Sequence, residues 1–507
     1  MIAMTLAEVA EAVDGRLVGP DGCDHWLMTA EATHDSRAVT PGSLFVALPG
    51  EHADGHSYVP MALAAGAVAA LTSRPIDSID GPLPCIVVAE VLNALALLAR
   101  AVLDRLPDCI VIGITGSSGK TSAKDLLAVL LADLAPTVVT PGNNNNELGL
   151  PLTVLRATAD TRFLVLEMGA RHLGNIAALC RTGRPTVGVV LNVGSAHIGE
   201  FGSQQAIAAT KRELPESLPA SGLCVLNGDD ALVSAMASRT AARVVTVGES
   251  VGTTLRISEL HTDDQARASF TLTTAGPVVE SARVSLRLHG EHHASNAAAV
   301  AAVALELGMD LARAAELLSS AESVSHWRME VTTTDSGLTL VNDAYNANPE
   351  SMRAALKSLR QMATAADGTR RRTWAVLGAM RELGHRHVAD HDAIGRLAVR
   401  LDINQLVVIG ADAKAMHLGA GMEGSWDSES IWVPDAGAAL QVLAERLEPG
   451  DVVLVKASRS EGLERLPGEL SALQLPARSP GARDDRRVPH PDFGATTHDE
   501  PAPGTSA

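Results

Sequence analysis

The pattern of hydrophobic positions predicts alternating strands and helices along most of the chain. Continuous apolar runs of strand length are typical of buried parallel strands. They occur at residues 44–48, 109–114, 163–169, 186–192, 223–227, 338–343, 373–377, 405–409 and 451–455. Helical periodicity or alanine-rich segments follow several runs, as at 123–134 and 290–307. This alternation predicts an α/β fold built on mostly parallel sheets.

Other segments have different patterns. Residues 255–288 alternate between apolar and polar positions, which predicts an antiparallel ribbon. Residues 1–15 are expected to be helical and contain three acidic residues, so they do not resemble a signal peptide. The apolar helices at 61–71 and 91–103 are too short, or too polar, to span a membrane.

The chain has 507 residues, more than one hydrophobic core supports. We expect a small N-terminal α/β domain at 1–106, a central domain with a mostly parallel sheet at 107–325, and a C-terminal domain at 326–475. The repeated strand–helix pattern of the C-terminal domain predicts a Rossmann-like doubly wound sheet. Residues 476–507 contain almost no apolar side chains, and we expect a disordered tail.

Charge and cysteine content narrow the possible partners. The formal net charge is -18, which argues against nucleic acid or an anionic membrane as the main partner. The five cysteines are scattered without Cys-x-x-Cys pairing, so we expect buried thiols in a reducing cytoplasm. Any anionic substrate must therefore be bound by local positive groups.

The most informative motif is a glycine-rich loop between the strand at 109–114 and the helix at 123–134. Its backbone N–H groups and the helix N-terminus favour phosphate binding. Lys120 would reach the β and γ phosphates, and the Thr121 hydroxyl would coordinate Mg²⁺. Ile114 stands where the strict motif has glycine, so this is the shorter form of the loop. The expected nucleotide-binding residues of the loop are Thr115, Gly116, Ser117, Ser118, Gly119, Lys120, Thr121 and Ser122.

Polar groups at other strand ends are further candidates. Glu167 ends a buried strand, where open α/β sheets bind ligands, and beside a phosphate loop we favour a Mg²⁺ ligand. His197 alone is more often a structural loop histidine. Ser36 and Arg37 beside a turn could hold a phosphate, although a solvated loop is the more common alternative. His292 and His293, being adjacent on an expected helix, should point about 100° apart, so a metal pair is discounted.

Taken together, the motifs resemble those of the Mur ligases of bacterial cell-wall synthesis over roughly residues 5–470. The family marks are the phosphate loop, Glu167, His197, Asn296, Arg328 and the segment 343–349 (DAYNANP). More specific marks are 142–151 (GNNNNELGLP) and 196–203 (AHIGEFGS), and in the first domain 35–37 (DSR) and 41–47 (PGSLFVA). The member that adds the third peptide residue also carries an Asp-Asn-Pro-Arg signature, which is absent from this sequence.

The resemblance implies an ATP-dependent amide ligase whose first domain binds a UDP-linked substrate. It is strongest to members that join D-alanyl-D-alanine to UDP-N-acetylmuramoyl-tripeptide, the last addition to the pentapeptide of the peptidoglycan precursor. In the family, ATP converts the peptide's terminal carboxylate into an acyl phosphate, which the amine then attacks. Bringing a carboxylate and a γ-phosphate together requires cations.

Roles for individual residues also follow from the resemblance. Lys120 and two Mg²⁺ ions would neutralise the phosphates, one ion on Thr121 and Glu167, the other on Glu167, His197 and a carbamylated Lys211. A lysine cation cannot bind Mg²⁺, whereas a carbamate offers anionic oxygens. Asn296 would contact adenine. Arg328 and Asp343 would reach the ribose or γ-phosphate from the linker and the third domain. Tyr345 is also expected to bind the nucleotide.

The sequence departs from the family pattern at four positions. His293 replaces an adenine-contacting asparagine, and Ala379 replaces an acidic residue. Ala457 replaces glycine, a mild change where φ is negative. Pro215 replaces an aromatic residue and should shorten the helix that carries Lys211.

Two alternatives stay open from the sequence. One is another amide ligase of the superfamily, such as a folylpolyglutamate synthetase-like enzyme. The other is a non-catalytic nucleotide-binding or scaffold protein, against which the intact phosphate-loop and metal residues argue. For the ligase we expect a cytoplasmic monomer without membrane insertion. We also expect the third domain to close over ATP before chemistry, because the essential groups lie on separate domains.

Overall fold

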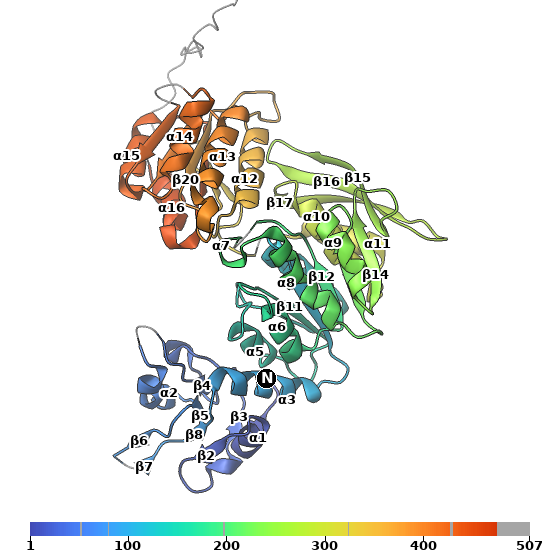
Figure 1. Cartoon of the computed structure of the whole chain (residues 1–507), viewed down its shortest axis with the longest axis vertical. Coiled ribbons are helices and arrows are strands. Elements are labelled where there is room, and N and C mark those ends of the chain that lie inside the picture. Colours follow the sequence, from blue (N-terminus) through green and yellow to red (C-terminus); the bar gives the residue numbers. More distant parts are fainter. Residues whose placement is uncertain (51–52, 80, 196–197, 323, 426–428, 474–507) are drawn as a thin grey trace, which may run out of the picture.

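The computed structural model describes residues 1–473 except 51–52, 80, 196–197, 323 and 426–428. Three α/β domains follow one another along the long axis of the molecule, with the N-terminal domain at one end and the C-terminal domain at the other (Figure 1). The α/β class and the three-domain arrangement predicted from the sequence are confirmed. The predicted tail, 476–507, lies outside the described residues.

The N-terminal domain is a four-stranded sheet in the order β2-β8-β5-β4. Helices α1 and α3 pack on one face, and α2 covers the other. The helix expected over 1–15 is confined to α1, because residues 4–5 form a strand and Thr5 caps the helix. The elements are β1 (Met4–Thr5), α1 (Leu6–Ala12), β2 (Arg16–Val18), β3 (Leu27–Met28), β4 (Leu44–Val46), α2 (Val59–Ala64), β5 (Ala69–Thr72), β6 (Asp77–Ser78), β7 (Gly81–Pro82), β8 (Cys85–Val87) and α3 (Val91–Asp104).

The central domain contains a nine-stranded sheet in the order β10-β11-β9-β12-β13-β14-β15-β16-β17. Pairing is parallel from β10 to β15 and antiparallel in the ribbon β15–β17, as the alternating pattern predicted. The strands are β9 (Ile110–Thr115), β10 (Thr137–Val139), β11 (Phe163–Glu167), β12 (Val187–Val190), β13 (Leu223–Asn227), β14 (Arg243–Gly248), β15 (Leu255–Thr262), β16 (Arg267–Thr274) and β17 (Ser281–His289). The helices are α4 (Lys120–Leu134), α5 (Gly149–Val154), α6 (Asn175–Gly183), α7 (Ile198–Phe201), α8 (Gln204–Ser217), α9 (Ala231–Ser234), α10 (His293–Glu306) and α11 (Leu311–Ser320).

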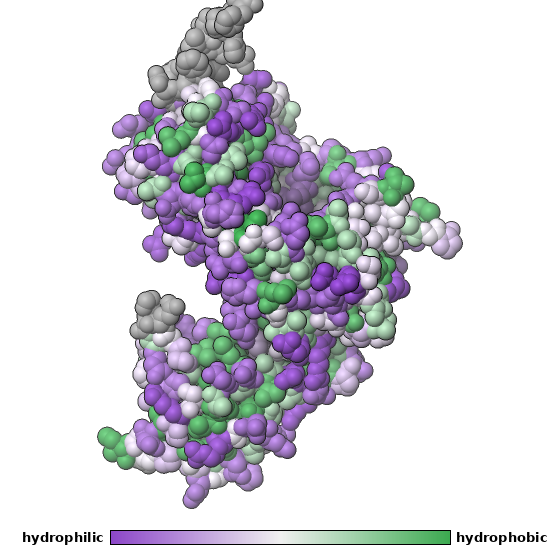
Figure 2. All heavy atoms as spheres, viewed as in Figure 1, coloured by the Kyte–Doolittle hydropathy of each residue, from purple (hydrophilic) through white to green (hydrophobic). Residues whose placement is uncertain are grey.

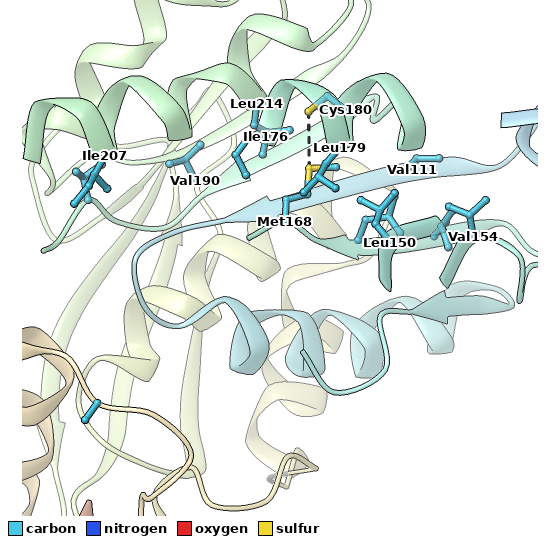
Figure 3. Close-up of a cluster of buried hydrophobic side chains, with 14 of the residues drawn as sticks. Val111, Leu150, Val154, Met168, Ile176, Leu179, Cys180, Val190, Ile207 and Leu214 are labelled. Atoms are coloured by element: carbon cyan, nitrogen blue, oxygen red, sulfur yellow. Dashed lines mark hydrogen bonds between the residues drawn. The ribbon is translucent and has the colours of Figure 1, made fainter. Parts of the chain in front are cut away.

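Helices cover both faces of the central sheet. Residues of α4, α10 and α11 share one apolar cluster with the strands, and α5, α6 and α8 pack in a second cluster on the opposite face (Figure 3). Glycine in the middle strands lets α8 approach closely. A Cβ on Gly113 would lie 3.0 Å from Leu214 Cδ1, and one on Gly188 would lie 2.9 Å from Leu218 Cδ1. This packing holds α8, the helix that carries Lys211, against the sheet.

The C-terminal domain is a six-stranded sheet in the order β18-β19-β23-β20-β21-β22. Separate apolar clusters join α12–α14 to one face and α15 and α16 to the other, as in the predicted doubly wound sheet. Its elements are β18 (Glu330–Thr333), β19 (Thr339–Asn342), α12 (Pro349–Gln361), β20 (Thr373–Leu377), α13 (His387–Arg400), β21 (Gln405–Ile409), α14 (Lys414–Glu423), β22 (Ser430–Val433), α15 (Ala436–Arg446), β23 (Val452–Lys456) and α16 (Leu466–Ser471).

Helix α8 ends at Ser217, two residues after Pro215, so the proline lies in its last turn. The prediction for the two adjacent histidines was wrong. The rings of His292 and His293 do not diverge. Their centroids are 4.2 Å apart, although His292, directly before the helix, has helical backbone angles (φ −59°, ψ −16°). Within the described part of the chain, no helix is long and apolar enough to cross a membrane.

Candidate active site

The phosphate loop connects β9 to α4 at the carboxyl edge of the central sheet. Gly119 has φ +80° and immediately precedes Lys120, the first residue of α4. A Cβ on Gly119 would lie 2.6 Å from Asn296 Oδ1, so both the backbone angle and the space require glycine. The loop therefore presents the N-terminus of a fifteen-residue helix, with Asn296 of α10 directly beside it.

A neighbouring loop braces the phosphate loop. Asn192, just after β12, accepts hydrogen bonds from Ser118 N (2.9 Å) at its side chain and from Ser117 N (3.1 Å) at its carbonyl. Its Nδ2 donates to Ser118 O (3.1 Å), and Gly194 N donates to Ser117 Oγ (2.9 Å). Sequence analysis missed Asn192, although a polar residue that ends an apolar strand next to a phosphate loop is the signal that identified Glu167.

The remaining residues of the predicted loop have identifiable positions. Thr115 is buried in β9, and its hydroxyl donates to Met168 O (3.0 Å), so it joins β9 to the segment after β11. Lys120 Nζ donates to Gly116 O (2.7 Å). Burial lowers the pKa of Lys120; the charge of Arg328 adds to this, and Glu167 opposes it. Ser122 lies in the first turn of α4. Lys120 thus shares one small region with Glu167 and Arg328.

Glu167 is the centre of the candidate metal site. Its carboxylate is 1% exposed and accepts hydrogen bonds from Thr121 Oγ1 (2.9 Å) and Asn145 Nδ2 (2.7 Å). The charge of Lys120 acts on this carboxylate, and buried carboxylates are normally paired or bind a metal. The Thr121 hydroxyl and the carboxylate are hard oxygen donors, as Mg²⁺ prefers. The residues present therefore fit a magnesium ion. Asn145 comes from the segment 142–151, which sequence analysis quoted as a specific mark of the family without giving Asn145 a role.

Lys211 projects from α8 and is 8% exposed. Burial lowers its pKa well below the ordinary value, and the charge of Lys120 lowers it further. Burial thus disfavours the ammonium form and favours the neutral amine, which is the form that can react with carbon dioxide. His197, the third predicted ligand, lies outside the described residues. Among the described residues, no cluster of three or more His, Cys, Asp or Glu side chains could hold a metal.

Two unpaired polar atoms lie beside the phosphate loop on α10. Asn296 Nδ2 and His293 Nδ1 are buried and have no hydrogen-bond partner among the described residues. Burial lowers the pKa of His293 well below its ordinary value, so the ring is neutral. Buried polar groups are rarely left unsatisfied, and a donor beside a neutral imidazole can pair with a nucleotide base. The pair fits a nucleotide at the predicted adenine position.

The predicted residues of the linker and third domain lie together. The Arg328 guanidinium is 4.1 Å from the centre of the Tyr345 ring. Burial raises the pKa of Tyr345. Asp343 is engaged within the domain: it pairs with buried Lys456 (2.6 Å) and accepts from Met329 N (3.1 Å). Sequence analysis did not assign a role to Lys456.

The remaining departures from the family pattern are packed in the third domain. Ala379 is fully buried, so an acidic side chain there would lie in the core. Ala457 is also fully buried and is not among the positive-φ residues, so alanine is tolerated. In the first domain, Arg37 forms two hydrogen bonds to Asp35 (2.9 and 2.8 Å), which lower the pKa of that carboxyl to about 2. The Arg37 side chain itself is 86% exposed.

The central and C-terminal domains meet next to the phosphate loop. Glu350 of α12 accepts from Ser195 N and Ser195 Oγ (both 3.0 Å), and Glu382 O accepts from Gly199 N (2.9 Å). A polar pocket of about 390 Å³ lies at this junction, lined in part by Gln204, Arg353 and Arg386. In the view of Figure 2, the surface is hollowed between the N-terminal and C-terminal domains.

Three family models match the chain in order. The Mur ligase family catalytic domain matches residues 31–104, the Mur ligase middle domain 114–304, and the Mur ligase glutamate ligase domain 327–459. The UDP-N-acetylmuramoyl-tripeptide--D-alanyl-D-alanine ligase of Mycobacterium tuberculosis is 48% identical over 501 residues, covering 91% of this chain and 96% of that protein. The enzyme of the same name from Escherichia coli is 33% identical, covering 92% of this chain and 98% of that protein.

Solved structures agree with the sequence comparison. A crystal structure of MurF from Acinetobacter baumannii has a TM-score of 0.81 at 30% identity, covering 92% of this chain and 99% of that one. MurF ligase from Thermotoga maritima, in complex with ADP, has a TM-score of 0.74 at 29% identity, covering 88% and 97%. Agreement of this extent across all three domains, together with the arrangement of the phosphate loop, Glu167 and Lys211, means that the chain belongs to the Mur ligase family of ATP-dependent ligases.

Proposed function

We propose that this protein joins D-alanyl-D-alanine to UDP-N-acetylmuramoyl-tripeptide at the expense of ATP, forming the pentapeptide precursor, ADP and phosphate. The relatives that match nearly the whole chain are named for this reaction. The observation that carries the proposal is the convergence of Lys120, Glu167 and Arg328 at one edge of the central sheet. These groups suit the transfer of a phosphoryl group to a carboxylate.

The first chemical problem is the approach of two anions. A carboxylate is a poor electrophile, and ATP supplies the leaving group by forming an acyl phosphate. Lys120 at the start of α4 and Arg328 from the linker place positive charge where the γ-phosphate and carboxylate meet. The phosphate loop holds the other phosphate oxygens through backbone N–H groups, with Asn192 keeping the loop in shape.

Magnesium, when bound, supplies additional neutralising charge and orients the phosphates. Thr121 and Glu167 would hold one ion, and Glu167, His197 and a carbamylated Lys211 would hold a second. Asn145 and Thr121 each hydrogen-bond to one oxygen of Glu167, which keeps the carboxylate directed at this place. The buried amine of Lys211 supports the carbamate, since addition of carbon dioxide to a neutral amine gives an anionic group and releases a proton.

The remaining predicted residues recognise the nucleotide. We infer that Asn296, with its unpaired Nδ2, contacts the adenine, and that neutral His293 replaces the usual asparagine beside it. Tyr345 lies on Arg328 and keeps it next to the nucleotide. Asp343 acts here through Lys456 and the linker backbone, in addition to the predicted contact with ribose or phosphate.

The overall arrangement assigns a part to each domain. The N-terminal domain, predicted at 1–106, binds the UDP end of the substrate, and the peptide extends from it toward the phosphate loop of the central domain. Closure of the C-terminal domain then completes the site. Because the reaction consumes ATP and a nucleotide-linked precursor, we place it in the cytoplasm, with the protein acting as a monomer and without nucleic acid or membrane.

The decisive experiment measures phosphate release with UDP-linked tripeptide, D-alanyl-D-alanine and ATP, against each mixture that lacks one component. Rapid release only in the complete mixture, with the pentapeptide as product, is expected. Lys120→Ala is the control for contaminating ATPases. Release that requires a folate and glutamate in place of these substrates would overturn the proposal. For the carbamate, Lys211→Ala should be inactive and partly rescued by a small carboxylic acid, whereas lack of rescue by any such acid contradicts it.

A further inference from the structure

The linker into the C-terminal domain has an unusual backbone. It runs from the end of α11 to β18, and Arg328 lies near its end. The residues on either side, Trp327 (φ +60°) and Met329 (φ +50°), are both left-handed. Bulky residues disfavour this conformation, so two of them within three positions indicate that the surroundings enforce it.

Backbone hydrogen bonds to the C-terminal domain hold the left-handed pair. Trp327 N donates to Glu330 Oε2 (3.0 Å), and Trp327 O accepts from Tyr345 N (3.1 Å). Met329 N donates to Asp343 Oδ1 (3.1 Å). The peptide groups on both sides of Arg328 are therefore bound to one rigid body, which leaves its side chain a restricted range of directions.

Two cation–aromatic contacts extend this arrangement to the side chains. The Arg459 guanidinium lies 4.2 Å from the centre of the Trp327 ring, and Arg328 lies 4.1 Å from that of Tyr345. Arg459 also pairs with Glu464 (3.0 Å), which fixes its own position. Arg459 follows β23 in the sequence, so the Trp327 ring is held by a strand end more than a hundred residues away.

The other end of the linker belongs to the central domain. Ser325 Oγ donates to Asp125 Oδ2 (2.5 Å) on α4, the helix that begins with Lys120. The chain thus passes from one domain to the other between residues 325 and 327. Arg328 immediately follows this crossing, and its charge affects both Lys120 and His293 across the junction.

We propose that Trp327 is a positioning residue for the ligase reaction. Clamped by Arg459 and held in the left-handed conformation, it directs Arg328 toward the phosphate loop, so that docking of the C-terminal domain and placement of the Arg328 charge occur together. This inference rests on the proposed function, in which Arg328 meets the transferred phosphoryl group. A misplacement of about 1 Å in such a group can cost on the order of a hundredfold in rate.

The test compares Trp327→Gly, Arg328→Ala and the double variant. Glycine accepts the left-handed angle without strain, so Trp327→Gly removes the ring while leaving the backbone conformation available. We expect kcat to fall about tenfold to a hundredfold with the KM for the UDP-peptide unchanged. Adding Trp327→Gly to Arg328→Ala should cause no further loss. Trp327→Phe, which keeps a ring under Arg459, should retain most activity.

A second partner gives an independent check. Arg459→Ala should reproduce the kcat defect of Trp327→Gly, and the two changes combined should be no worse than either alone. Wild-type kcat in Trp327→Gly, or losses that multiply in the Arg328→Ala background, would overturn the proposal. If the losses multiply in the double variant and the melting temperature also falls, Trp327 has only a structural role.

Nucleotide binding separates this inference from the proposed function. Affinity for a non-hydrolysable ATP analogue, compared with ADP, should fall in Trp327→Gly as it does in Arg328→Ala, and not further in the double variant. If that holds while the wild type fails to release phosphate with the proposed substrates, the positioning role stands and the proposed function fails. If the analogue binds Trp327→Gly as tightly as the wild type, the positioning role fails.

Discussion

Glu350 connects the C-terminal domain to the loop that braces the phosphate loop. Its carboxylate accepts two hydrogen bonds from Ser195, and Gly194, the preceding residue, donates to Ser117. A Cβ on Gly194 would lie 3.0 Å from Glu350 Cδ, so the approach is close. We predict that Glu350→Ala weakens docking of the C-terminal domain and therefore slows the first chemical step.

The size of the effect follows from the contacts. A hydrogen bond to a charged group contributes about 1.5–3 kcal/mol when it is shielded from water. The Glu350 side chain is 36% exposed, so solvent screening reduces the contribution. We expect about 1.5 kcal/mol for the two bonds together, which corresponds to about a tenfold smaller docking constant.

Two measurements test this prediction. Single-turnover formation of ADP in the presence of the UDP-peptide should slow about tenfold, and small-angle scattering should show a more extended molecule with an ATP analogue bound. Glu350→Gln, which keeps one acceptor, should fall between wild type and Glu350→Ala. Arg353→Ala is the matched control on the same helix, because its guanidinium lies 4.0 Å from Glu350 and is 42% exposed. Unchanged ADP formation together with unchanged scattering in Glu350→Ala would refute the reasoning.

Three further predictions concern catalysis, packing and acid stability. Lys120→Ala should reduce ADP formation at least about a hundredfold, as measured by phosphate release, because it removes a preorganised charge. Gly395→Ala should lower the free energy of unfolding by at least about 3 kcal/mol in urea titrations, because its Cβ would lie 1.8 Å from Met416 O. The control Gly421→Ala should be neutral or stabilising, because its Cβ would meet no described atom within 4 Å. Burial lowers the pKa of His391 from 6.5 to about 4, so the folded state favours the neutral ring. The neutral His391 ring should contribute about 3 kcal/mol to the free energy of unfolding above pH 6.5, and this contribution should be lost as the pH falls toward 4. Unfolding measured at several pH values tests this expectation.

Each of these predictions has a contradicting result. Lys120→Ala with wild-type turnover and a folded circular dichroism spectrum would remove the phosphate loop from the chemistry. Equal melting temperatures for Gly395→Ala and Gly421→Ala would mean that α13 and α14 are not packed backbone to backbone. Replacing His391 by Gln should flatten the acid-side loss of stability, and an unchanged slope would assign that loss to other groups.

Much of the fold could be read from short-range patterns. The apolar run at 109–114 corresponds to β9, that at 163–169 contains β11, and the alternating segment 255–288 forms the antiparallel ribbon β15–β17. These predictions succeed because a strand or helix leaves its periodicity in consecutive residues. Residues 1–15 were harder, because the two-residue strand β1 is too short to leave such a pattern.

Some residues of the candidate site could likewise be predicted from local patterns, and others could not. The phosphate loop was recognisable because glycine, lysine and threonine act within one turn of chain, and Glu167 because it ends an apolar strand. Asn192, by contrast, braces Ser118 across 74 positions, and Glu350 reaches Ser195 across 155. No local pattern contains such pairs, since they depend on how whole domains pack.

The amino-acid order alone therefore predicted the class of the fold and the family to which the chain belongs, together with a candidate nucleotide site at the phosphate loop. Folding in three dimensions decided which groups are buried together. It left Lys211 in an environment that disfavours its charge, left Asn296 Nδ2 without a partner within the described part of the chain, and brought Arg459 onto the ring of Trp327. The physical reason is that burial and long-range contacts are properties of the packed molecule, whereas the patterns that predict helices, strands and loop motifs lie in neighbouring residues of the sequence.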